Sequence, residues 1–205
     1  MNIEVVDLKI VVTGFEAFLK NTENPSLEVI RLLPKSISGN QIYTLELPVA
    51  YDKCFEPLKK IIDEISPDIV ICLGLAQGRT SITPERVAIN ISDVSVPDNL
   101  GVLKTDDPII ENGEAAYFST LPIKEMVEAM KLKGIPATIS NSAGTYVCNN
   151  VMYYLLAYNK TNNLNMKAGF IHVPLMDDQS NDGNHFSMPL ASILEGIIAS
   201  IKICL

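Results

Sequence analysis

The stretch Leu8–Thr13, LKIVVT, is an almost unbroken apolar run that ends at Gly14. Such a run is typical of a central strand covered on both faces, because a strand with one face in water alternates apolar and polar residues. Two more runs of this kind follow, Asp68–Leu73 (DIVICL) and Ala168–Val173 (AGFIHV). Three buried strands so far apart in the chain predict a sheet enclosed between layers of helices.

Predicted helices separate these strands. Asn24 caps the first helix, Pro25 occupies its first position, and Pro34 stops it. Further helices are predicted from Asp52 to Ile65, at Pro122–Lys133, at Tyr146–Tyr158 and after Ser187, and further strands at Gln41–Leu47, Arg86–Ile91 and Pro136–Ile139. Over 205 residues this alternation predicts one α/β domain, residues 1–205, built as a three-layer sandwich with a mostly parallel central sheet.

The composition favours a folded, acidic protein. Hydrophobic residues make up 47% of the chain and the mean hydropathy is +0.21, which allows a buried core and excludes global disorder. The formal net charge is -8, and no run of basic residues is longer than Lys59-Lys60. Neither a nucleic acid nor an anionic membrane is therefore expected as a partner.

The cysteines and the two ends of the chain indicate where the protein works. Four cysteines lie at positions 54, 72, 148 and 204 without a CxxC pair, so we expect no metal site and a reduced, cytoplasmic setting. The first residues carry acids where an export signal needs basic residues. The apolar stretch from Ile193 is broken by Glu195 and Lys202 and is too short to span a bilayer.

Cys148 is the strongest candidate nucleophile. It follows the loop Asn141–Thr145 and falls in the first turn of a predicted helix. There the helix dipole and unpaired backbone N–H groups favour a thiolate, and the same N–H groups could hold an oxyanion. Cys54, Cys72 and Cys204 fall within predicted helices or a strand and are interpreted as small buried apolar residues.

The chain has only two histidines, so a base has two candidates. His172 ends a buried strand, just before Pro174, whereas His185 lies in a polar loop. Glu85 directly precedes the strand predicted from Arg86 and by itself is an ordinary surface acid. A cysteine at a helix start with a histidine and an acid at strand ends is the arrangement of a thiol hydrolase, but spacing alone does not bring the three together.

Six segments, in order along nearly the whole chain, resemble motifs of the pyroglutamyl peptidase I (pyrrolidone carboxyl peptidase) family of cysteine peptidases. They are TGFEAF at 13–18, PERVAIN at 84–90, PDNLG at 97–101, AYFSTLP at 116–122, SAGTYVCN at 142–149 and GFIHVP at 169–174. No single motif is decisive, and the ordered set carries the resemblance.

The resemblance implies a phosphorylase/hydrolase-like α/β fold, no cofactor, a cytoplasmic location and a homo-oligomer, either a tetramer or a dimer. Its implied substrates are peptides with an N-terminal pyroglutamate. Cys148 would attack the carbonyl of the pyroglutamyl bond, His172 would carry the proton and Glu85 would orient the imidazole. Phe15, Phe18 and Val147 would line the lactam pocket, and an apolar pocket suits this neutral ring and rejects a charged N-terminus.

Two departures from the family pattern leave alternatives open. Leu19-Lys20 stand where the family usually has Gly-Gly, and Ser95 stands where it typically has an arginine that helps to hold the oxyanion or the substrate. A weakly active or inactive homologue that binds pyroglutamyl-type ligands, or that serves as an assembly partner, is therefore the alternative. A nucleoside phosphorylase of similar architecture would need a phosphate-binding loop, for which Gly74–Thr80 (GLAQGRT) is a weak candidate.

Overall fold

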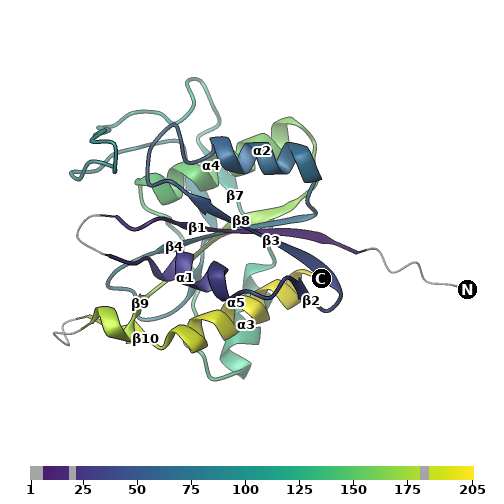
Figure 1. Cartoon of the computed structure of the whole chain (residues 1–205). Coiled ribbons are helices and arrows are strands. Elements are labelled where there is room, and N and C mark those ends of the chain that lie inside the picture. Colours follow the sequence, from purple (N-terminus) through teal and green to yellow (C-terminus); the bar gives the residue numbers. More distant parts are fainter. Residues whose placement is uncertain (1–6, 19–21, 181–184) are drawn as a thin grey trace, which may run out of the picture.

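A six-stranded sheet forms the middle of the molecule in the computed structural model, which describes residues 7–18, 22–180 and 185–205 (Figure 1). In spatial order its strands are β2 (Ser36–Ile37), β3 (Asn40–Leu47), β1 (Lys9–Phe15), β4 (Ile69–Leu75), β8 (Lys167–Val173) and β5 (Thr83–Pro84). The four inner strands are parallel, and the two-residue strands at the edges run antiparallel to their neighbours. The predicted mostly parallel central sheet is confirmed.

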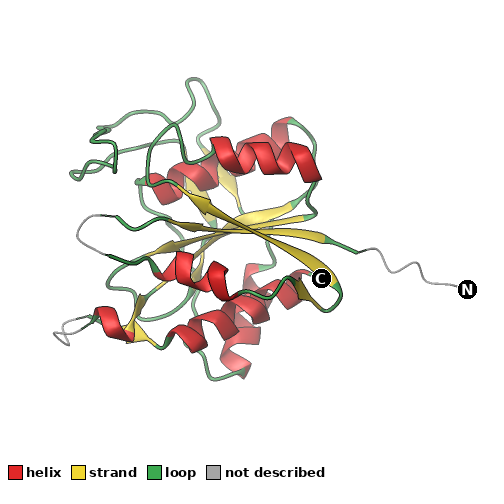
Figure 2. Ribbon diagram, viewed as in Figure 1, coloured by secondary structure: helices red, strands yellow, loops and turns green. Residues whose placement is uncertain are grey.

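Helices cover both faces of this sheet, as Figure 2 shows. One layer consists of α1 (Pro25–Leu32), α3 (Ile123–Leu132) and α5 (Leu190–Cys204), and the other of α2 (Glu56–Ile65) and α4 (Val147–Thr161). Each layer packs its own cluster of buried apolar side chains onto the sheet. The three-layer α/β prediction is therefore confirmed, and the carboxyl ends of β1, β4 and β8 meet at one edge of the sheet.

The connection between β1 and α1 is fixed by a cluster of buried polar groups. Asn24 caps α1 as predicted, because its Oδ1 accepts hydrogen bonds from Ser26 N (3.1 Å) and Ser26 Oγ (2.8 Å). Its Nδ2 donates to the carbonyl of Glu16 (2.9 Å), and Ser26 Oγ accepts from the N–H of Phe15 (3.0 Å). A Cβ atom on Gly14 would lie 2.4 Å from Ser26 O, so only glycine fits there.

Short elements outside the central sheet differ from the predicted ones. Part of the strand predicted at Arg86–Ile91 forms β6 (Val87–Ile89), which pairs with β7 (Ala116–Phe118) in a separate antiparallel sheet. The segment Pro136–Ile139 contributes only an isolated bridge at Ala137. The last helix begins at Leu190, because Ser187 lies in β10 (Ser187–Met188), which pairs with β9 (Leu175–Met176) ahead of a short 3₁₀ turn at Asp177–Gln179.

Two absences concern the described part of the chain only. None of its helices has both the length and the apolar content needed to cross a bilayer. Its histidine, cysteine and acidic side chains form no group of three or more that could hold a metal ion.

We predict that Asn24→Ala lowers the free energy of unfolding by about 1–2 kcal/mol, because the cap of α1 is lost inside the protein. Urea denaturation at neutral pH measures this change. Asn24→Ser, which keeps a capping oxygen, should lose less. Equal stability of Asn24→Ala and the wild type would contradict the role assigned to the cap.

Candidate active site

Glu85 and His172 meet at the end of the central sheet. His172 lies on β8, and the edge strand β5 pairs Thr83 with His172 in antiparallel register, so that Glu85 emerges beside the imidazole. His172 Nδ1 lies 2.7 Å from Glu85 Oε1. Because a carboxylate can only accept, Nδ1 carries the hydrogen and Nε2 is left free to accept a proton. Glu85 is 0% and His172 4% exposed, so this hydrogen bond is shielded from water.

Cys148 lies at the same end of the sheet, in the first turn of α4. It is the second residue of α4, and Gly74 of β4 pairs in register with His172. A Cβ atom on Gly74 would lie 2.9 Å from Cys148 Sγ and 2.7 Å from Phe170 Cζ. The sulfur therefore fills the space that a side chain at position 74 would need, next to the strand position of His172. Among the described residues no hydrogen bond joins Cys148 to His172, a bond that in thiol hydrolases often tightens only with substrate bound.

Burial shifts the pKa values of both groups of this pair. It raises the pKa of the Cys148 thiol to about 12, the Glu85 carboxylate acts in the same direction, and Arg79 and a backbone hydrogen bond oppose them. Burial also lowers the pKa of His172, although the hydrogen bond and charge of Glu85 oppose that shift. Both shifts favour the neutral thiol and the neutral imidazole, the form in which the imidazole can take the thiol proton during attack.

The other cysteines and His185 lie outside this arrangement. Cys54, Cys72 and Cys204 are fully buried, as the sequence predicts, whereas Cys148 is only partly buried. Burial raises the pKa of Cys72 to about 12 and that of Cys204 to about 11. His185 is exposed. Cys148 is thus the one described cysteine that a ligand can reach.

A small apolar cavity opens beside the sulfur. Phe15, Phe18 and Val147, the three residues expected to line a lactam pocket, do line it together with Cys148, and its volume is about 40 Å³. Its remaining walls are Asn24, Val49, Leu75 and Tyr146. The rings of Phe18 and Tyr146 lie 6.2 Å apart. Leu19 and Lys20 lie outside the described residues.

Ser95 lines a second cavity next to the first. This cavity has a volume of about 600 Å³, and Asp93, Val94 and Val96 also line it. Phe18 and Tyr146 line both cavities, so together they form the wall between them. Ser95 is exposed and lines only the second cavity, whereas Cys148 lines only the first.

The sequence did not predict that Arg79 contacts Glu85. Its Nη1 donates to Glu85 Oε1 (2.6 Å) and to Thr83 Oγ1, and its Nη2 donates to the carbonyl of Ser142 (3.0 Å). Arg79 belongs to the loop considered above as a weak candidate for binding phosphate, but in the structure its guanidinium is engaged with Glu85. The sequence offered one signal for this contact. Arg79 is a basic residue in a short loop after a buried strand, and it precedes the candidate acid Glu85 by six residues.

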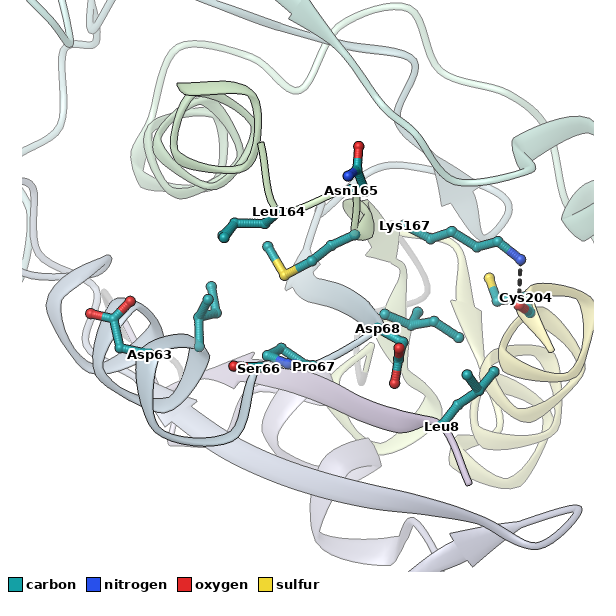
Figure 3. A pocket seen from close by; sticks show the side chains of 12 residues that line it. Leu8, Asp63, Ser66, Pro67, Asp68, Leu164, Asn165, Lys167 and Cys204 are labelled. Atoms are coloured by element: carbon teal, nitrogen blue, oxygen red, sulfur yellow. Dashed lines mark hydrogen bonds between the residues drawn. The ribbon is translucent and has the colours of Figure 1, made fainter. Parts of the chain in front are cut away.

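Another cavity of similar size to that of Ser95 lies at the opposite edge of the sheet, and Glu85, Cys148 and His172 do not line it. Figure 3 shows it at the amino ends of β1, β4 and β8, where Leu8, Asp68 and Lys167 line it. Its volume is about 580 Å³. The Lys167 ammonium donates to the carbonyl of Cys204 (2.6 Å). Size alone therefore does not identify the reactive site of this protein.

Comparison with known proteins agrees with this geometry. A family model described as pyroglutamyl peptidase matches residues 8–205. Pyrrolidone-carboxylate peptidases of Thermosipho africanus and Clostridium perfringens are 50% and 47% identical over 196 residues, which is 95% of this chain and 96% and 92% of theirs.

Solved structures give the same result. Pyroglutamyl peptidase I of Bacillus amyloliquefaciens superposes with a TM-score of 0.93 at 36% identity, covering 96% of each chain. Pyrrolidone carboxyl peptidase of Thermococcus litoralis superposes with a TM-score of 0.92 at 39% identity, covering 96% of this chain and 93% of that one. With a family model that spans almost its entire length and relatives this similar, the chain belongs to the pyroglutamyl peptidase family.

Proposed function

We propose that this protein hydrolyses the bond after an N-terminal pyroglutamyl residue, with Cys148 as nucleophile, His172 as base and Glu85 as the residue that orients the imidazole. The observation that carries the proposal is the buried Glu85–His172 hydrogen bond of 2.7 Å beside a cysteine at the start of a helix. Membership of the pyroglutamyl peptidase family favours an active peptidase over a homologue that only binds or assembles.

The residues act in a defined order in this proposal. His172 Nε2 takes the proton of Cys148 as Sγ bonds to the pyroglutamyl carbonyl carbon, and the carbonyl oxygen becomes an oxyanion. The first turn of α4 has no side-chain cap, so its N–H groups are free to donate to that oxyanion. His172 then protonates the leaving amine as the C–N bond breaks. Water, deprotonated by His172, hydrolyses the thioester and restores the Cys148 thiol with release of pyroglutamate.

The small cavity gives a physical basis for choosing pyroglutamate. Its walls are mostly apolar, and Phe15, Phe18 and Val147 supply most of the contact expected with the ring. A lactam has no charge, so it loses little hydration there. An ordinary N-terminus would bring a charged amine away from water without a partner, which costs several kcal/mol. The same surface thus accepts one class of substrate and rejects the other.

We also infer that residues 1–205 work as one domain, that copies of the chain form a homo-oligomer, either a tetramer or a dimer, and that the protein acts in the cytoplasm. Exposed Leu100, Leu103 and Phe118 support assembly, and a thiol nucleophile supports a reducing compartment.

We expect a single unfolding transition in calorimetry, because the chain is one domain. We also expect light scattering to give a mass above that of the 22.5 kDa chain, because the chains assemble. A mass equal to that of one chain would rule out the oligomer, and recovery of the protein outside the cytoplasmic fraction would rule out that location.

We predict that Cys148→Ala abolishes hydrolysis of a pyroglutamyl amide and that iodoacetamide alkylates Cys148 before the three buried cysteines. Peptide mass spectrometry after timed labelling identifies the order. Cys204→Ala is the matched control and should keep its activity, because Cys204 packs in the helix layer on the other face of the sheet. Faster labelling of another cysteine, or full activity of Cys148→Ala, would show that the nucleophile is wrongly assigned.

We predict that Ser95→Arg raises kcat/KM on pyroglutamyl amides. One lost oxyanion or substrate donor slows a reaction by about thirty- to a thousandfold, and Ser95 is too short to replace an arginine from the far wall of the cavity. Ser95→Gln, of similar reach but without charge, is the control and should gain much less. The opposite result would be a wild type of ordinary peptidase efficiency whose kcat/KM Ser95→Arg leaves unchanged or lowers. It would show that another group already stabilises the oxyanion or the substrate in place of the arginine.

A further inference from the structure

Arg79 is joined to both halves of the candidate active site. Its side chain is 26% exposed and reaches inward to the fully buried Glu85, with 2.6 Å between Nη1 and Oε1. Its other terminal nitrogen donates to the carbonyl of Ser142, six residues before Cys148 (3.0 Å). One guanidinium therefore connects the acid that holds His172 with the loop that leads into α4.

The buried carboxylate of Glu85 needs this partner. Oε1 accepts from both His172 and Arg79, whereas Oε2 has no hydrogen-bond partner among the described residues. Because burial favours a neutral His172, the histidine does not supply the balancing charge at rest. A buried carboxylate without a counter-charge is strongly disfavoured, and the guanidinium, 2.6 Å away, supplies that counter-charge.

We propose that Arg79 is a positioning residue of the reaction. It provides the counter-charge of the Glu85 carboxylate and holds that carboxylate toward His172. Through the carbonyl of Ser142 it also fixes the loop Asn141–Thr145, so that Cys148 faces the same imidazole. This inference rests on the proposed function for its kinetic consequences. The geometry behind it, one arginine bridging Glu85 and Ser142, does not depend on which substrate is cleaved.

The charge of Arg79 also determines the direction in which the pH dependence of the reaction should shift. The guanidinium acts to lower the pKa of His172, together with burial, and to lower that of Cys148. Without it, the coupled Glu85–His172 pair takes up a proton at higher pH. The reaction needs His172 as a neutral base, so the acid limb of kcat/KM moves to higher pH when Arg79 is replaced.

The test compares three variants with the wild type. Arg79→Gln removes the charge, and Arg79→Lys keeps a charge but not the two-sided link between Glu85 and Ser142. Arg86→Gln is the matched control, because the Arg86 side chain donates through Nε to Asn141 Oδ1 in the same loop (2.7 Å), whereas the Glu85 carboxylate is bound by Arg79. Two readouts are taken: kcat/KM on a pyroglutamyl amide against pH, and the NMR titration of the imidazole of His172, with exposed His185 as internal reference.

Arg79→Gln should lower kcat by about ten- to a hundredfold, the range expected for one charge-assisted hydrogen bond, and should move the His172 titration and the acid limb to higher pH. Arg79→Lys should lower kcat but leave the titration close to that of the wild type. Arg86→Gln should change neither. An unshifted His172 titration in folded Arg79→Gln, or an equal shift in Arg86→Gln, would overturn the proposal.

A double-mutant cycle separates positioning from mere folding. If Arg79 acts through Glu85, Arg79→Gln should add little to the loss that Glu85→Gln already causes. If Arg79→Gln lowers kcat by the same factor in the wild type and in Glu85→Gln, Arg79 does not act through Glu85. The NMR titration needs no substrate, so a wild type without pyroglutamyl hydrolysis would refute the proposed function, while the shift of His172 would still decide the role of Arg79. If Arg79→Gln does not fold, Arg79→Lys and the cycle made with it decide the question instead.

Discussion

A carboxylate completely removed from water is the constraint around which the active end of this protein is built. Glu85 is fixed through its backbone, whose N–H donates to the carbonyl of Phe170 (2.9 Å), and through its side chain, which accepts from His172 and Arg79. Removing one partner of such a buried pair typically costs about 3–5 kcal/mol, because the remaining charge is stranded. The fold therefore has to bring the edge strand β5, strand β8 and the loop of Arg79 together before the carboxylate can be buried.

The rest of the site follows from the edge at which this happens. The parallel strands β1, β4 and β8 end side by side, and α4 starts above that edge with Cys148 in its first turn. The missing side chain of Gly74 leaves room for the sulfur. The same burial that protects the Glu85–His172 bond favours the neutral forms of the thiol and the imidazole. The imidazole is thus available as a base beside the one described cysteine that a ligand can reach, and charge develops as the carbonyl is attacked.

The parts of this account that are visible in the sequence are those that depend on local pattern. Unbroken apolar runs predicted the three inner strands β1, β4 and β8, and Asn24 with Pro25 predicted the start of α1. Resemblance to a family singled out Glu85, Cys148 and His172. Contacts between distant segments were not visible. The strand after Arg86 lies outside the central sheet because it pairs with β7. Arg79 belonged to a loop considered for phosphate binding, and only the fold places it against Glu85. The start of α4 favours a thiolate at Cys148, and the burial of the thiol in the folded chain, which opposes it by raising the pKa, was not visible in the sequence.

The central claim is that Cys148, served by the buried pair Glu85 and His172, acts on a neutral lactam ring held in an apolar pocket. Its most direct test is to measure the rates of hydrolysis of the pyroglutamyl, prolyl and alanyl amides of one fluorogenic amine under the same conditions. Proline has the same five-membered ring but carries a protonated amine, so the comparison isolates the neutral lactam from ring size. The account predicts rapid release from the pyroglutamyl amide and almost none from the other two. Comparable hydrolysis of the prolyl or alanyl amide would contradict it.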